Sequence, residues 1–141
     1  MDLPISRHLL KVMRQSSGAS TFDRARRAAK SGNYLEAIAG FTQVLESHPD
    51  AEKAWYEKGK ALVAAGELIE AVNCLREAID LNPKSHPTWN HLAMALTKLG
   101  RYEEALTSYD KAIGLKRDHH KTWYNRGNHP PALGRNPRSP Q

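Results

Sequence analysis

Few residues in the chain have the types and spacing that chemistry requires. Asp118, His119 and His120 are consecutive, and carboxylate and imidazole groups are metal ligands. Adjacent histidines on a helix point in different directions, so a solvated turn is the simpler interpretation. Cys74 is the single cysteine, which excludes a disulfide within the chain and favours a small packed thiol.

No motif for catalysis or cofactor binding follows from the remaining residues. A Gly-rich phosphate loop, a nucleophile elbow and a paired metal-ligand motif are all missing from the sequence. No stretch approaches the ~20 apolar residues of a membrane span, and the start has no long apolar core for a secretory signal. We therefore expect no enzymatic activity, no cofactor or metal, and a cytoplasmic location.

Charge is distributed unevenly along the 141 residues, whose formal net charge is +6. Residues 1–30 hold seven Lys and Arg against two Asp, and residues 116–141 hold six against one. The central residues 31–115 hold eight basic and twelve acidic side chains. A basic balance alone favours nucleic acid or acidic membranes as partners, but the acidic centre weakens that interpretation.

The residue pattern of the elements that would position a functional site repeats every 34 residues. Trp55, Trp89 and Trp123, which are all the tryptophans, are spaced by this period. Small, aromatic and turn-forming residues follow the same register: Ala25, Gly59, Ala93 and Gly127; Gly32, Gly66, Gly100 and Gly134; Tyr34, Leu68 and Tyr102; Ala37, Ala71 and Ala105; Phe41, Leu75 and Tyr109; Val44, Ala78 and Ala112; Pro49 and Pro83.

Each period predicts a pair of antiparallel helices. Residues 34–46, 52–65, 68–81, 86–99 and 102–115 have apolar residues at helical spacing. Glycines 32, 66 and 100 can adopt the left-handed conformation that ends a first helix, and Pro49 and Pro83 end second helices. One such pair cannot bury its apolar face alone, so neighbouring pairs must stack. The pairs are expected at 18–47, 52–81 and 86–115.

The pattern resembles the tetratricopeptide repeat (TPR) family, most closely in PTWNHLAMALTKLGRYEEALTSYDKAIGL, residues 87–115. This resemblance implies an all-α, right-handed superhelix of antiparallel helix pairs, with three TPR units plus a partial fourth. The TPR domain would cover 18–128, with units 18–51, 52–85 and 86–119 and a partial unit 120–128. Thr21 and Arg24 depart from the Trp and Leu of the pattern, so the first helix is expected to be looser.

The two ends have different predicted roles. In the N-terminal segment 1–17, one helical face holds Ile5, Leu9, Val12 and Met13. This face favours a capping helix over a membrane-surface or partner-binding helix. Pro130 and Pro131 interrupt the fourth unit, so 120–128 is a short stub and 129–141 a disordered tail. The chain is either a piece of a longer array or ends naturally here.

In the TPR family the first helix of each unit lines a concave groove, and the resemblance places candidate peptide-binding residues there. These are Phe22, Arg26, Lys30, Lys53, Tyr56, Lys60, Asn90, Met94, Lys98, Lys121, Tyr124 and Asn128. Lysine and arginine can bind carboxylates, asparagine can pair with a peptide backbone, and aromatic rings can receive apolar side chains. Ordinary solvated lysines are the alternative explanation.

One TPR subset clamps the C-terminal carboxylate of heat-shock chaperones with Lys, Asn and Arg side chains. The matching places here hold Phe22, Arg26, Glu57, Pro87 and His91. None of them matches the clamp, and Glu57 would repel a carboxylate. Chaperone-tail binding by the clamp mode is therefore not expected.

The leading functional hypothesis is a protein–protein interaction scaffold that binds a peptide segment with acidic and apolar residues on its concave face. The alternative is RNA binding, since related helical repeats bind RNA and the groove combines lysines with aromatic residues. The acidic centre argues against nucleic acid as the leading partner. A docking part of a larger enzyme is a third hypothesis.

Overall fold

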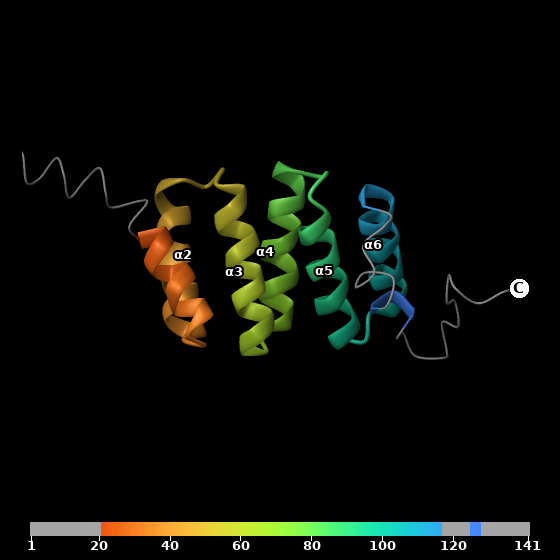
Figure 1. The fold of residues 1–141 in the computed structure, drawn as a ribbon, viewed down its shortest axis with the longest axis horizontal. Helices are drawn as coiled ribbons and strands as arrows, with labels where there is room; N and C mark the ends of the chain where they lie inside the picture. Colours follow the sequence, from red (N-terminus) through yellow and green to blue (C-terminus); the bar gives the residue numbers. More distant parts are fainter. Residues whose placement is uncertain (1–20, 117–124, 128–141) are drawn as a thin grey trace, which may run out of the picture.

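A computed structural model describes residues 21–116 and 125–127. Residues 21–30 are helical and precede α2 (Tyr34–Ser47), α3 (Glu52–Ala65), α4 (Leu68–Leu81), α5 (His86–Lys98) and α6 (Tyr102–Leu115). These helices form a row of antiparallel pairs (Figure 1), and no strand occurs among the described residues. The all-α, TPR-type architecture predicted from the sequence is confirmed.

Several sequence-based predictions fall on the remaining residues. The N-terminal cap at 1–17, the tail at 129–141 and the candidate residues Lys121, Tyr124 and Asn128 all lie outside the described part of the chain. Of the partial fourth unit, residues 125–127 are described and helical. Arg126 Nε donates to Asp110 Oδ1 at 2.7 Å, which joins this turn to α6.

The first helix of each pair ends at a left-handed glycine, as the sequence predicts. Gly32, Gly66 and Gly100 have φ values of +83°, +84° and +81°, a region that favours glycine because it has no Cβ. At the second of these turns, the Glu67 N–H donates to the Leu62 carbonyl at 2.9 Å. This bond satisfies a helix-end carbonyl and reverses the chain into α4.

The tryptophan register has a structural cause at the turns between units. Helices α2 and α4 end at Ser47 and Leu81, two residues before a proline. Trp55 Nε1 donates to the Pro49 carbonyl at 2.8 Å, and Trp89 Nε1 donates to the Pro83 carbonyl at 2.7 Å. The two indoles are therefore held in the same orientation by equivalent bonds.

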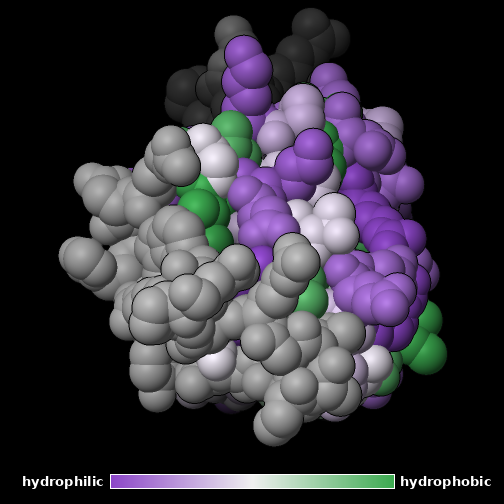
Figure 2. All heavy atoms as spheres, turned by 90° about the vertical axis from the view of Figure 1, so that its right-hand side faces the viewer, coloured by the Kyte–Doolittle hydropathy of each residue, from purple (hydrophilic) through white to green (hydrophobic). Residues whose placement is uncertain are grey.

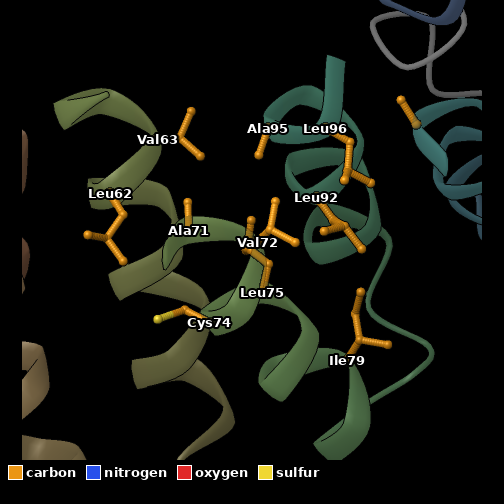
Figure 3. Close-up of a cluster of buried hydrophobic side chains, with 11 residues drawn as sticks. Leu62, Val63, Ala71, Val72, Cys74, Leu75, Ile79, Leu92, Ala95 and Leu96 are labelled. Carbon is orange, nitrogen blue, oxygen red and sulfur yellow. The ribbon is translucent and has the colours of Figure 1, made fainter. Parts of the chain in front are cut away.

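Small residues let the paired helices approach closely. Ala37, Ala71 and Ala105 are fully buried, and a Cβ built on Gly59 would lie 2.6 Å from Leu75 Cγ across the second pair. The main apolar cluster joins α3, α4 and α5 through residues such as Leu62, Leu75 and Leu96 (Figure 3). Close helix packing is thus set by the residues that repeat most strictly.

The helices form two layers, and the layers differ in how closely their members approach. Neighbouring first helices α3 and α5 contact each other, whereas among the described helices α2, α4 and α6 contact one another less. The stack therefore curves toward the layer of residues 21–30, α3 and α5, which we call the inner layer. Helices α2, α4 and α6 form the outer layer. The solvent side of the inner layer is the concave face.

Residues 21–30 of the first helix are helical despite two departures from the TPR pattern. Thr21, at the tryptophan position, is 8% exposed, while Arg24, at the leucine position, is exposed. Phe22 compensates by packing edge-to-face against Phe41 of α2, with ring centroids 5.6 Å apart.

Candidate functional site

The two layers carry opposite charge. The inner-layer helices hold eight Lys and Arg and three acidic residues, a net charge of +5. The outer-layer helices hold two and eight, a net charge of −6. Viewed from the α6 end, the coloured surface is largely hydrophilic with separate hydrophobic patches (Figure 2). The near-neutral total of these helices therefore conceals a basic inner layer and an acidic outer layer.

A hollow of about 310 Å³ lies on the concave face between residues 21–30 and α3. Three candidate cations line it, Arg26, Lys30 and Lys60, with Tyr34 and Glu57 beside them. Its remaining lining consists of the side chains of three alanines: Ala29, Ala61 and Ala64. Because the alanine side chains are small, the hollow can hold a ligand group. The three cations favour a carboxylate there.

Two of these cations lie near the faces of neighbouring aromatic rings. The Arg26 guanidinium lies 5.8 Å from the Phe22 ring centroid, and Lys60 Nζ lies 5.2 Å from the Tyr56 ring centroid. Lys60 Nζ also lies 3.9 Å from Glu57 Oε2. Arg26 is exposed and Lys60 is partly exposed, and such contacts near solvent contribute little to stability. Both side chains can therefore exchange partners when an anion binds.

Next to the hollow, Tyr56 and His91 connect α3 to α5. Their rings meet edge-to-face with centroids 5.4 Å apart, and Tyr56 Oη lies 3.4 Å from His91 Nδ1. That nitrogen is 2.9 Å from the Pro87 carbonyl oxygen, to which it donates. Burial, followed by the charges of Glu57 and Glu52, raises the pKa of Tyr56 to about 12. Its hydroxyl is therefore a neutral donor near neutral pH.

The other candidate residues on α3 and α5 differ in accessibility. Lys53 and Lys98 are exposed, and Met94 is half-buried. Asn90 is only 6% exposed, and its Oδ1 has no hydrogen-bond partner among the described residues. A buried amide oxygen is usually satisfied, so this atom needs a donor from water or from a partner.

Sequence reasoning missed Tyr34 as a lining residue because it belongs to a second helix. Its position repeats as Leu68 and Tyr102, which indicated packing rather than a surface role. In the structure Tyr34 is half-buried, follows the Gly32 turn and lines the hollow. A residue just after a turn can reach the concave face. The position of Tyr34 two residues after Gly32 could therefore have identified it as a lining residue.

Residues 21–116 and 125–127 contain no group of three or more His, Cys, Asp or Glu side chains placed to hold a metal ion. Cys74 is buried, and burial raises the pKa of its thiol. None of the described helices has the length and apolar character needed to cross a membrane. The cytoplasmic location stays a prediction.

Solved structures show the same fold. An O-GlcNAc transferase mutant of Thermobaculum terrenum is 25% identical, with a TM-score of 0.73. The match covers 79% of this chain but 22% of that one, so the chain spans about a fifth of the transferase's length. The first TPR domain of Spaghetti (RPAP3), bound to the HSP90 peptide SRMEEVD, is 19% identical with a TM-score of 0.80, covering 84% of this chain and 94% of that one.

A third structure, the second TPR domain of human RPAP3 in complex with the HSP70 peptide SGPTIEEVD, is 20% identical with a TM-score of 0.76. It covers 79% of this chain and 93% of that one. No curated protein matches the sequence.

Family membership follows from the sequence match rather than from the fold. The family model described as anaphase-promoting complex, cyclosome, subunit 3, matches residues 30–112, which is more than half of the chain. This stretch includes helices α2 to α5 and most of α6, the same helices whose glycines, alanines and tryptophans keep the 34-residue register. The chain therefore belongs to the family of anaphase-promoting complex, cyclosome, subunit 3, whose repeats are of the TPR type.

Proposed function

We propose that the chain is a protein-interaction scaffold whose concave face binds an extended peptide with acidic and apolar side chains. The observation that supports this most directly is the net charge of +5 on the inner layer beside −6 on the outer layer. A long surface formed by successive first helices suits a polymer ligand better than a small metabolite. The proposed role needs no catalysis and no cofactor.

The acidic part of the ligand would bind in the hollow between residues 21–30 and α3. Arg26, Lys30 and Lys60 present three cationic groups around alanine walls. Glu57 offsets part of this charge through Lys60, 3.9 Å away. A ligand carboxylate would compete for Lys60 and would find Arg26 and Lys30 on the opposite wall.

The apolar part of the ligand would pack one helix further along. Tyr56 and His91 form an aromatic corner between α3 and α5, and half-buried Met94 follows on α5. Aromatic and methionine side chains serve as anchors at protein interfaces. Because first helices pack about 8–10 Å apart and an extended chain rises about 3.3 Å per residue, the acidic and apolar ligand residues should be about three positions apart.

The peptides bound to the two RPAP3 domains combine these features, since SRMEEVD and SGPTIEEVD both contain acidic and apolar residues. Their binding mode is a separate question. We expect this chain not to clamp a C-terminal carboxylate, because Glu57 lies at a clamp position and is half-buried beside Lys60. Acidic side chains, rather than the chain end, would then contribute the charge.

Fluorescence polarisation with labelled SRMEEVD tests both statements. The peptide should bind, and amidation of its C-terminus should change the affinity by less than about two-fold, below 0.5 kcal/mol. The double variant Lys53→Glu with Lys60→Glu should bind about ten-fold more weakly.

The matched control reverses two exposed lysines away from the hollow, Lys84 and Lys111, and should leave the affinity unchanged. If both double variants bind the peptide with equal affinity, the proposal that the concave face is the binding site is wrong. A labelled single-stranded RNA in the same assay tests the alternative function. RNA binding that falls steeply with salt, about 0.7 log units per log unit of salt for each phosphate neutralised, together with no peptide binding, would favour it.

A further inference from the structure

The outer face contains a groove of about 400 Å³ that the concave-face proposal does not use. Its walls are α4 and α6, and its floor is the outward side of α5. The floor is apolar and consists of Trp89, Leu92 and Leu96, with Ile79 on one wall. Leu92, Leu96 and Ile79 come from the two helices that meet there (Figure 3). Groove volumes of this size accommodate ligand side chains.

The preceding unit shows how the equivalent groove is filled. One period earlier the floor is α3, and Lys58 occupies the place of Leu92. The Lys58 side chain is 12% exposed, and its Nζ lies 6.0 Å from the Trp55 ring centroid and 4.0 Å from Glu70 Oε1. Its aliphatic stem thus covers apolar surface while the ammonium group sits over an indole and near a carboxylate.

The groove over α5 repeats this arrangement without the lysine. Trp89 is oriented like Trp55 by its bond to the Pro83 carbonyl, but Leu92 is too short to cross the ring and carries no charge. The described residues place no cation over Trp89. Glu104 corresponds to Glu70, and it accepts from Arg76 at 3.0 Å and from Arg101 at 2.6 Å.

Three charged residues line the groove: Arg76, Asp80 and Glu104. Arg76 and Glu104 form an ion pair with each other, which leaves Asp80 as the charge of the lining that is unpaired among the described residues. Asp80 lines the groove, is exposed, and forms no ion pair within the described part of the chain. A cationic ligand group could therefore approach Asp80 without displacing an existing partner.

We propose that this groove, lined by α4, α5 and α6, is a second docking site that receives a lysine or arginine side chain of a protein partner, together with an adjacent apolar side chain. The partner's basic side chain lies over half-buried Trp89, with its cation beside Asp80. The site selects a basic, apolar segment, opposite in charge to the ligand of the concave face, and it does not depend on the concave-face proposal.

The test uses a short labelled peptide with a Lys-Arg pair between leucines, and the same peptide with two glutamates in place of the basic pair. The full chain should bind the basic peptide at least about ten-fold more tightly than the acidic one, by fluorescence polarisation. Leu92→Lys places a lysine where Lys58 stands in the preceding unit, so it should fill the groove and weaken binding of the basic peptide about ten-fold.

Because Leu92 is 3% exposed, circular dichroism must show that Leu92→Lys is folded. If it is not, the surface variant Asp80→Lys decides, and it should weaken the basic peptide about three-fold or more. Asp50→Lys, an exposed reversal in the turn before α3, is the matched control and should have a much smaller effect. Equal affinity of Asp80→Lys and Asp50→Lys, or no binding by the unaltered chain, would overturn the proposal. Concentration-dependent self-association abolished by Asp80→Lys would assign the groove to a second copy and would also overturn it.

Discussion

The inner and outer layers are made from the same 34-residue repeat, yet they present opposite charges to solvent. Between the layers, the repeating positions hold alanine, glycine and large apolar side chains that are buried in every unit. On the solvent-facing sides of both layers, equivalent positions differ in charge and size, as with the exposed Lys30, Ala64 and Lys98. The interface between the layers specifies the fold, and the solvent-facing positions are free to specify partners.

The two grooves of the outer face illustrate the same separation on a smaller scale. Trp55 and Trp89 keep identical backbone anchors, whereas the residue three positions later is lysine in one unit and leucine in the next. The lysine that lies beside Trp55 and Glu70 in one unit is therefore missing from the next, while the tryptophan anchors are the same in both. Functional differences between repeats can thus arise at single positions.

Breaking the interface between the layers should have the largest effect. Ala71 is fully buried where α4 meets α3, so Ala71→Trp overpacks that contact and should lower the free energy of unfolding by about 3 kcal/mol or more. Lys84→Trp, at an exposed turn position, should change it by less than about 0.5 kcal/mol. Urea unfolding followed by circular dichroism measures both, and equal midpoints would contradict the assigned register.

A turn between the layers should be the next most sensitive place. Gly66 has φ +84° and no atom within 4 Å of a built Cβ, so Gly66→Ala is opposed by the backbone conformation alone, at about 1–2 kcal/mol. Gly114 lies within α6 and also has open space around it. Gly114→Ala should therefore raise stability by less than about 1 kcal/mol. Thermal unfolding should show shifts of opposite sign, and a shared sign would refute the assignment of strain to Gly66.

The smallest expected effect concerns charge on the outer layer. Hydrogen bonds from Arg101 and then Arg76 hold the pKa of Glu104 below its ordinary value. A carboxylate with a lowered folded-state pKa adds stability above its unfolded-state pKa of about 4.3. That contribution disappears as the pH falls through the folded-state pKa. The stability difference between the unaltered chain and Glu104→Gln should be small at pH 7 and vanish in acid. A difference that grows as the pH falls would contradict this sign.

The sequence predicted the fold well because its main signals are local or strictly periodic. Glycines with positive φ, prolines after second helices and alanines at helix contacts follow from residue type and spacing. The surfaces were less predictable because they depend on which side chains meet across units. The Lys58 contact with Glu70, the position of Tyr34 beside the hollow and the burial of Asn90 all depend on how neighbouring helices pack.

Hydrogen exchange of the full chain with and without unlabelled SRMEEVD tests the central claim, that the concave face is the peptide-binding face. The account predicts slower exchange in residues 21–30, α3 and α5, strongest around Arg26 and Lys60, with little change in α2, α4 and α6. Slower exchange confined to α2, α4 and α6, with no change around Arg26 and Lys60, would contradict it.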